Sequence, residues 1–287
     1  MRPRVLHTLA WLVLLAAVAP AQDDTVHFAV IGDMGTGGRR QREVGAVMDK
    51  VRTERFPFTF VLTVGDNMYG SQTPAAFQRK FVRPYKALLD GGVKFYAALG
   101  NHDRPSQRDY EPFNMNGQRY YTFTKGPAQF FALDSTLMTR EQVQWFEAEL
   151  QRSQAPWKIA YMHHPLYSSG ARHGPEVVLR QALEPLLVRY GVQVMFAGHE
   201  HFYERIVPQK GVQHFINGAG GQLRLFNIRA TKDTAAGYDT DNSFMVARIR
   251  GDELYFETIT RRGWSVDSGI VHRLGGTRTT APLTSGR

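Results

Sequence analysis

Residues 59–69 read Thr-Phe-Val-Leu-Thr-Val-Gly-Asp-Asn-Met-Tyr, and this stretch decides the fold. Its first part, Thr59–Val64, is nearly all apolar and rich in β-branched residues, which is typical of a strand buried on both faces of a sheet. Asp66 and Tyr69 follow directly. A carboxylate and a phenol so close in the chain can reach one ion. The stretch therefore predicts a buried strand that ends in metal ligands.

Four further segments repeat this arrangement: Asp33-Met34-Gly35, Gly100-Asn101-His102-Asp103, Met162-His163-His164-Pro165 and Gly198-His199-Glu200-His201. Predicted buried strands lead into them at Val26–Ile31, Val93–Leu99, Lys158–Met162 and Val192–Ala197, and Phe130–Leu133 is another such run. From Asp33 to Asp66 and from Asp66 to Asn101 the interval is about 35 residues, which suits a strand, a loop and a helix. We therefore expect the ligands to return to one edge of a sheet. Two carboxylates, a phenol, an amide and several imidazoles suit two metal ions better than one.

Helical patterns separate these strands. Apolar residues at Val44, Val47, Met48 and Val51 have helical spacing, and Thr139 with Gln142 predicts a capping box. A third helix is expected from Glu176 to Tyr190, with a possible kink at Pro185. The last third of the chain predicts strands at Gln213–Asn217, Ser243–Arg250 and Glu253–Thr260, the last two joined as a hairpin. We expect them to form a second sheet that packs on the first, with helices outside.

The order of the motifs resembles that of the calcineurin-like metallophosphoesterases, and among them the purple acid phosphatases. The family pattern DxG, GDxxY, GNH(D/E), a lone His and GHxH is present in order, over about residues 28–221. The segments GDNMYG, GNHD, HHP, RHGP, GHEH and NGAGG are most similar to the small, tartrate-resistant branch. This resemblance implies a four-layer α/β/β/α sandwich of two mixed sheets flanked by helices.

The resemblance also implies a ligand set for two metals. The first metal would take Asp33, Asp66, Tyr69 and His201, and the second would take Asp66, Asn101, His163 and His199, with Asp66 as the bridge. A phenolate favours iron(III) at the Tyr69 site, while imidazole and amide ligands suit a divalent ion such as iron, zinc or manganese. Taken singly, the aspartates could instead be helix caps, Tyr69 a half-buried aromatic residue and the histidines core residues.

Other residues of the motifs have implied roles at the substrate. His102 and His173 resemble the histidines that contact phosphate in the family, and either one is a candidate proton donor to the leaving group. Asn101 would also face the substrate, and Asp103 is a candidate to orient His102. Neighbours in an extended chain face opposite ways, so only one of His163 and His164 should bind metal, and His164 is expected to line the pocket. The same alternation should place His199 and His201 on one face.

Composition limits the class of protein. The chain has 287 residues, of which 43% are hydrophobic, no cysteine and a net charge of +9. Disulfides are therefore excluded, and stability must come from the core and bound metals. The basic balance suits anionic substrates, but no basic run with interleaved aromatic residues indicates a nucleic-acid surface.

Residues 1–21 have the features of a secretory signal. Arg2 and Arg4 precede an apolar stretch from Leu9 to Val18 and a small-residue site at Ala19-Pro20-Ala21. The alternative, an uncleaved anchor, is disfavoured because this stretch is short for a bilayer. We predict a secreted or periplasmic monomer without a membrane span, with one domain over residues 22–274 and a disordered tail over 275–287.

The sequence thus predicts a secreted phosphatase that hydrolyses small phosphate monoesters by attack of a metal-bound hydroxide at an Fe(III)–M(II) centre. A phosphodiesterase or nucleotidase with the same centre is the alternative within the enzyme class. A third hypothesis is a protein that binds metal or phosphate without catalysis. The intact motif set, with His102 and both aspartates present, argues against it.

Overall fold

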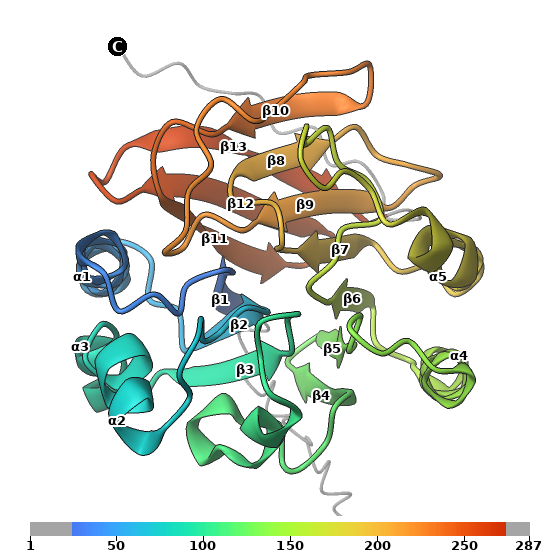
Figure 1. Cartoon of the computed structure of the whole chain (residues 1–287). Helices are drawn as coiled ribbons and strands as arrows, with labels where there is room; N and C mark the ends of the chain where they lie inside the picture. The colour runs from blue at the N-terminus through green and yellow to red at the C-terminus, as the bar shows by residue number, and fades with distance from the viewer. Residues whose placement is uncertain (1–24, 274–287) are drawn as a thin grey trace, which may run out of the picture.

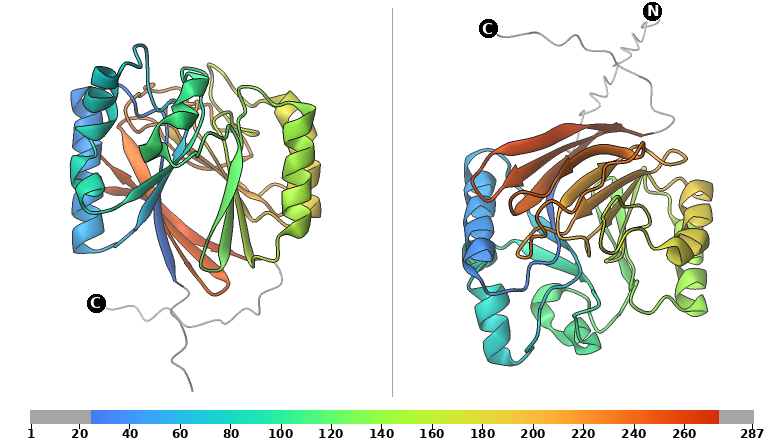
Figure 2. Two further views of the ribbon diagram at one scale, coloured as in Figure 1. Left: turned by 90° about the horizontal axis from the view of Figure 1, so that it is seen from below. Right: turned by 45° about the horizontal axis from the view of Figure 1, so that its top comes forward.

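Two mixed β-sheets lie face to face between two groups of helices in the computed structural model, which describes residues 25–273 (Figures 1 and 2). The α/β sandwich predicted from the sequence is therefore confirmed. The predicted signal segment (1–21) and the predicted tail (275–287) lie outside the described residues, and so do residues 22–24 and 274 at the ends of the predicted domain. Within residues 25–273, no helix combines the length and the apolar character that crossing a membrane requires.

The first sheet has six strands in the order β13-β12-β11-β1-β2-β3. Their bounds are β1 (Val26–Ile31), β2 (Phe60–Val64), β3 (Lys94–Ala98), β11 (Ser243–Arg250), β12 (Glu253–Thr260) and β13 (Ser265–His272). The strands β1, β2 and β3 are parallel, and β11, β12 and β13 are antiparallel to their neighbours.

The second sheet has seven strands in the order β10-β8-β9-β7-β6-β5-β4. Their bounds are β4 (Tyr121–Lys125), β5 (Ala128–Ala132), β6 (Trp157–Tyr161), β7 (Val194–Ala197), β8 (Tyr203–Ile206), β9 (Gln213–Asn217) and β10 (Thr234–Tyr238). The central strands β5, β6, β7 and β9 are parallel.

This division of strands corrects one expectation. The C-terminal strands were expected to build a second sheet together, but β11 and β12 extend the first sheet while β9 belongs to the second. The reason is that β2 pairs with only one edge of β1. β11 pairs with the other edge, over the register Val26↔Ile249 to Val30↔Met245. β11 thereby completes the hydrogen bonding of β1, whose residues are almost all buried.

The helices cover the outer faces of the sheets (Figure 2). On the side of β1–β3 lie α1 (Arg39–Glu54), α2 (Pro74–Phe77), the π-helical turn that continues it to Val82, and α3 (Lys86–Asp90). On the other side lie α4 (Arg140–Arg152) and α5 (Val177–Arg189), with Pro185 inside α5. Short 3₁₀ turns span Pro105–Asp109 and Glu111–Phe113.

The capping box predicted at α4 is only half formed. Thr139 is the N-cap and accepts from the Gln142 backbone N–H, as predicted. The Gln142 side chain instead bonds the backbone N–H and C=O of Asp134. Because Gln142 is fully buried, it ties α4 to the loop after β5 rather than capping its own helix.

Aromatic rings hold the two sheets together. Phe28 of β1 packs edge-on against Phe130 of β5, with ring centroids 5.4 Å apart, and against Phe196 of β7 at 6.1 Å. Phe215 of β9 meets Phe256 of β12 at 4.8 Å. Because these rings are fully buried and contributed by both sheets, they fix how the ends of the strands face each other.

Candidate metal centre

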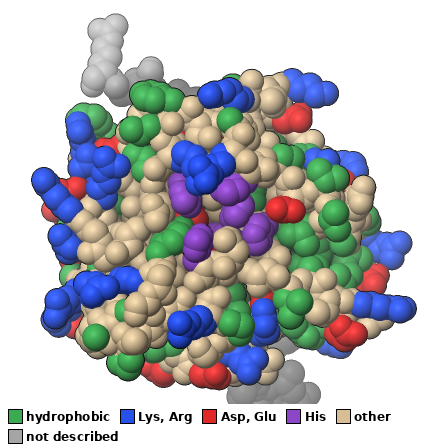
Figure 3. Space-filling model, viewed as in Figure 1, with side chains coloured by type: hydrophobic (Ala, Val, Ile, Leu, Met, Phe, Trp, Pro, Cys, Tyr) green, Lys and Arg blue, Asp and Glu red, His purple; other side chains and the backbone are tan. Residues whose placement is uncertain are grey.

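The sequence motifs converge where the carboxyl ends of the parallel strands of both sheets meet. Asp33, Asp66 and Asn101 follow β1, β2 and β3 of the first sheet, while His163 and His199 follow β6 and β7 of the second. The expectation of a single sheet edge is therefore wrong, because each sheet supplies part of the site. Figure 3 shows the histidine side chains gathered near the centre of one face of the molecule.

A first cluster of possible ligand atoms joins three residues. The Tyr69 hydroxyl lies 3.0 Å from Asp33 Oδ1 and 3.2 Å from His201 Nε2, and His201 Nε2 lies 3.3 Å from Asp33 Oδ1. Asp33 is fully buried, whereas His201 keeps 15% of its side chain exposed. These are three of the four residues predicted for the first metal.

A second cluster lies beside the first. Asn101 Oδ1 is 3.0 Å from His163 Nε2 and 3.1 Å from His199 Nδ1, and the two histidine nitrogens are 3.1 Å apart. Asp66 Oδ1 lies 3.5 Å from His163 Nε2. The four residues are those predicted for the second metal.

Asp66 lies between the two clusters. It interacts with the Tyr69 hydroxyl on one side and with His163 on the other. Ligand atoms of Asp33, Asp66 and His163 all lie within 4.8 Å of one another. One carboxylate within reach of both clusters is the arrangement that a bridged pair of metal ions requires.

The surroundings of His163 fix which of its ring nitrogens faces the cluster. Nδ1 is 3.0 Å from the backbone carbonyl oxygen of Val64, which can only accept, so Nδ1 carries the proton. Burial, followed by the neighbouring His164, holds the pKa of His163 well below its usual range, so the ring is neutral. Nε2 therefore points a lone pair at the oxygen atoms of Asn101 and Asp66. A cation is the partner that such a group of acceptors lacks.

The charge balance of the centre supports the same conclusion. Burial and the Asp66 carboxylate raise the pKa of Asp33 well above its usual range, and burial and Asp33 raise that of Tyr69. Burial lowers the pKa of His199 to about 2 and that of His201 to about 4. The imidazoles are thus neutral and supply no positive charge. Asp33 and Tyr69 would be anionic only beside a positive charge from another source. The donor set of oxygen and imidazole nitrogen fits two metal ions.

The backbone is strained at three of the predicted ligands. Asp33, Asp66 and His199 have φ angles of 53°, 50° and 69°, in the left-handed region that residues with side chains rarely occupy. Hydrogen bonds hold two of these turns, because Asp33 Oδ2 accepts from the His199 N–H and Asp66 Oδ1 from the His102 N–H. Such strain is typical of functional sites, where the surrounding structure fixes side-chain directions.

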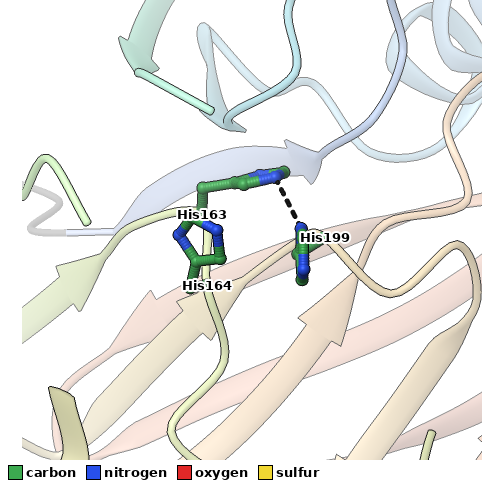
Figure 4. Close-up of side chains that lie close together, drawn as sticks. All are labelled: His163, His164 and His199. Atoms are coloured by element: carbon green, nitrogen blue, oxygen red, sulfur yellow. Dashed lines mark hydrogen bonds between the residues drawn. The ribbon is translucent and has the colours of Figure 1, made fainter. Parts of the chain in front are cut away.

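Two arguments that assumed an extended chain do not hold. His199 is not extended, although its ring and that of His201 both reach the centre, at His163 and at Tyr69 respectively. His163 and His164 do not face opposite ways either, since their ring centroids are 4.9 Å apart (Figure 4). The strand β6 ends at Tyr161, so strict alternation no longer applies there.

His164 borders the second cluster. Its ring centroid lies 4.4 Å from that of His199, and its nitrogen belongs to a possible three-histidine group with His163 and His199. Its Nδ1, however, lies 2.8 Å from the Ser135 hydroxyl. Its place fits the predicted role of lining the pocket. Sequence reasoning missed Ser135, although its place just after the predicted strand Phe130–Leu133 was a signal for it.

The two predicted catalytic histidines lie beside different clusters. The His102 ring is tilted against that of Tyr69, with ring centroids 4.8 Å apart, and the His173 ring lies 4.3 Å from that of His199. Both side chains are exposed. Burial, followed by the charges of Arg224 and Arg172, lowers the pKa of His173.

Asp103 does not act as predicted. Its carboxylate accepts from the backbone N–H groups of Asn67, Met68 and Gly100 at 2.9–3.0 Å. It therefore organises the loops that carry Asp66 and Asn101 instead of orienting the His102 ring. Its burial and the nearby Asp66 raise its pKa to about 7.

Known proteins resemble this chain in sequence and fold. Residues 26–203 match the calcineurin-like phosphoesterase family. Mouse tartrate-resistant acid phosphatase type 5 is 24% identical, and the match covers 80% of this chain and 82% of the mouse protein. Purple acid phosphatase 23 of Arabidopsis thaliana is 38% identical, and the match covers 75% of this chain and 57% of that protein. The structure of a purple acid phosphatase from yellow lupin superposes with a TM-score of 0.74 at 19% identity, over 93% of this chain and 58% of the lupin chain.

Proposed function

The chain belongs to the calcineurin-like phosphoesterase family and is a hydrolase of phosphoric esters, and from that premise we propose that it is a secreted acid phosphatase acting on phosphate monoesters at an Fe(III)–M(II) centre. The first metal would be held by Asp33, Asp66, Tyr69 and His201, and the second by Asp66, Asn101, His163 and His199.

The observation that carries this proposal is the approach of the Tyr69 hydroxyl to Asp33 and His201, at 3.0 and 3.2 Å. A phenol among a carboxylate and an imidazole becomes a hard, anionic ligand once it loses its proton, and such ligands favour a trivalent ion. Iron(III) at this cluster and a divalent ion at the nitrogen-rich cluster of His163 and His199 follow from the two donor sets.

The bound metals would supply an activated water molecule as the nucleophile and would offset the charge of the phosphate. The chain's own residues complete the site. The exposed rings of His102 and His173 flank the two clusters, so that each can hydrogen-bond a phosphate oxygen or the oxygen of the leaving group. The aromatic layer between the sheets keeps the two halves of the ligand set in place.

The proposal is tested by elemental analysis and a visible spectrum of the purified protein, followed by a substrate panel. We expect two metals per chain, at least one of them iron, and cleavage of 4-nitrophenyl phosphate in mild acid. Faster cleavage of bis(4-nitrophenyl) phosphate would instead favour a phosphodiesterase. A protein that binds both metals but cleaves neither ester would contradict the catalytic proposal.

Export is proposed on the sequence features of residues 1–21. N-terminal sequencing of the exported protein should give a chain that begins at Gln22, and retention of Met1 would contradict this cleavage site.

A further inference from the structure

Glu200 lies between two predicted ligands, His199 and His201, yet its side chain points away from both clusters. It is fully buried, and its Oε1 accepts from the backbone N–H of Gly174 at 2.8 Å. A Cβ placed on Gly170 would lie 2.0 Å from the same oxygen, so the loop that carries His173 closes directly over this carboxylate. Glu200 thus anchors that loop.

The other oxygen of Glu200 faces an arginine. Arg224 Nη1 lies 3.7 Å from Glu200 Oε2, which is beyond hydrogen-bonding distance. Nη1 is buried and has no hydrogen-bond partner within residues 25–273. The side chain as a whole keeps 22% of its surface exposed, so one edge of the guanidinium remains open.

Arg224 borders the proposed metal centre. Its backbone N–H donates to the carbonyl oxygen of His201 at 2.9 Å, and its charge acts on Asp33 and Tyr69 and on the rings of His173 and His201. The guanidinium is therefore held beside the place where a substrate phosphate would meet the metals.

The guanidinium of Arg224 is partly buried, and a buried N–H group without an acceptor costs free energy. Arginine presents five N–H donors in a planar fork that matches the oxygen atoms of a phosphate. Glu200 compensates part of the charge but accepts no hydrogen bond from Nη1. The other N–H groups of the guanidinium do not share the burial of Nη1, and a phosphate oxygen would accept hydrogen bonds from them on the exposed edge.

We propose that Arg224, positioned by Glu200, binds the phosphoryl group of the substrate and sets a preference for monoesters over diesters. This inference rests on the phosphatase function proposed above. A phosphate monoester has three non-bridging oxygens and carries up to two negative charges, whereas a diester has two such oxygens and one charge. A third cationic group beside two metals therefore favours the monoester.

The test compares Arg224→Ala and Arg224→Lys with wild-type protein, all loaded with metal. Arg189→Ala is the control, because it removes the same charge from an exposed position on α5. The measurements are metal content, the visible spectrum, the inhibition constant of inorganic phosphate, and kcat/KM for 4-nitrophenyl phosphate and its bis ester.

For Arg224→Ala we expect unchanged metal content and spectrum. The inhibition constant of phosphate should rise, and kcat/KM for the monoester should fall, by roughly 10- to 100-fold, the range for a lost hydrogen bond to a charged group. For the diester, kcat/KM should fall by a factor at least about threefold smaller than for the monoester, because its single charge and two free oxygens interact less with the guanidinium. Arg224→Lys should recover part of the loss, and Arg189→Ala should behave as wild type. An equal loss for both esters, or unchanged phosphate inhibition, would overturn the proposal.

Glu200→Gln tests the positioning role. Glutamine keeps an acceptor for the Gly174 N–H but removes the charge that faces Arg224. We expect weaker phosphate inhibition and a smaller monoester preference, with metals retained. An unchanged ratio of monoester to diester turnover in Glu200→Gln would show that Glu200 does not position Arg224.

Direct binding separates this inference from the proposed function. Calorimetric titration of metal-loaded wild-type and Arg224→Ala protein with inorganic phosphate needs no turnover. If the wild type cleaves neither ester, the proposed function is wrong, while a loss of phosphate binding in Arg224→Ala still supports the site. Equal phosphate binding by the two proteins contradicts the site whatever the activity.

Discussion

Tyr69 is the residue whose chemistry most depends on the identity of the metal. Burial and the carboxylate of Asp33 raise the pKa of its phenol, so the protein alone keeps it protonated. Only a strongly Lewis-acidic ion can displace that proton, and iron(III) does so more readily than a divalent ion.

Tyr69→Phe should therefore abolish visible absorption while leaving the fold intact. The phenolate is the ligand from which charge transfer to iron(III) would arise. The measurement is a visible spectrum at matched iron content, with far-ultraviolet circular dichroism as the check on folding. A Tyr69→Phe variant with the same colour as wild type would exclude Tyr69 as an iron ligand.

The histidines of the site should separate into two groups on substitution. His163→Ala removes a nitrogen that lies 3.0 Å from Asn101 Oδ1, so one metal and activity should be lost together. His102→Ala and His173→Ala should keep both metals while turnover falls by roughly 10²–10⁴-fold. Elemental analysis and turnover are measured on the same samples.

The choice of substrate then tells a proton donor from a binding residue. Aryl phosphates have leaving groups that need little protonation, so the loss of a general acid should affect alkyl phosphates more. If His173→Ala slows both classes equally, His173 binds substrate, and His102 becomes the candidate acid.

At the scale of elements, the loops after β1, β2 and β3 pack closely against one another. At two glycines, Gly35 and Gly100, the neighbouring loop leaves no room for a side chain. A Cβ on Gly35 would lie 1.9 Å from the Asn67 carbonyl oxygen, and one on Gly100 would lie 2.2 Å from the Asp66 backbone nitrogen. The loops thus hold one another in place.

Gly35→Ala should push the loop of Asp33 away from that of Asp66. We expect a loss of roughly 1–3 kcal/mol in the free energy of unfolding and reduced metal occupancy. Gly38→Ala is the control for steric contact, because the nearest atom to its Cβ is 3.4 Å away, and only the loss from replacing glycine at the N-cap of α1, less than about 1 kcal/mol, is expected there. Chemical unfolding and metal analysis check both. Equal stability and metal content in the two variants would show that this close contact is not needed.

The sequence predicted the strands with a continuous or a regular apolar pattern and missed several that have neither. The buried strands β1, β2 and β6 were recognised because nearly every residue is apolar, whereas β13, with the polar residues Ser265, Asp267 and Ser268, is an edge strand with an exposed face. The ligand residues were found from their motifs. Their directions were not, since alternation along an extended chain cannot foresee the left-handed turn at His199. Arg224 lacked any pattern of its own and required the fold to bring it to the centre.

For the molecule as a whole, the centre joins two sheets whose strand ends carry buried anionic groups. Removal of metal should leave Asp33 and Asp66 close together without a counter-ion. At metal concentrations about 100-fold above Kd, bound metal contributes about 3 kcal/mol per site to stability. Chelation should lower Tm by roughly 5–15 °C. Calorimetry before and after chelation, with metal added back as the control, measures this. An unchanged Tm in metal-free protein would mean that the centre does not stabilise the sandwich.

A buried histidine away from the centre should set part of the acid stability. His214 in β9 is 4% exposed, and burial lowers its pKa to about 4 from an unfolded value near 6.5. The unfolded chain therefore takes up a proton at higher pH than the folded protein does. Stability is lost as pH falls from 6.5 to 4, by about 3 kcal/mol from this group.

His214→Phe should remove that contribution and flatten the acid limb of the stability curve. Urea unfolding at several pH values between 7 and 4 provides the measurement, and His272→Phe, at an exposed position, is the control. Parallel curves for wild type and His214→Phe would contradict this role.

The pairing of β1 with β11 also constrains the order of assembly. Residue 26 lies beside residue 249, so β1, which leads into Asp33, keeps an unpaired edge until residues 243–250 have been synthesised. Contacts so distant in sequence form slowly, because the entropy of closing a long loop is lost before the contacts can stabilise the chain. A ribosome-bound fragment that stops before β11 would contain every proposed metal ligand. It would still lack β11, the strand that pairs with β1 and so supports the loop of Asp33. Truncated chains of this length should therefore be poor at capturing metal, and a late, cooperative acquisition of metal is the expected course of folding.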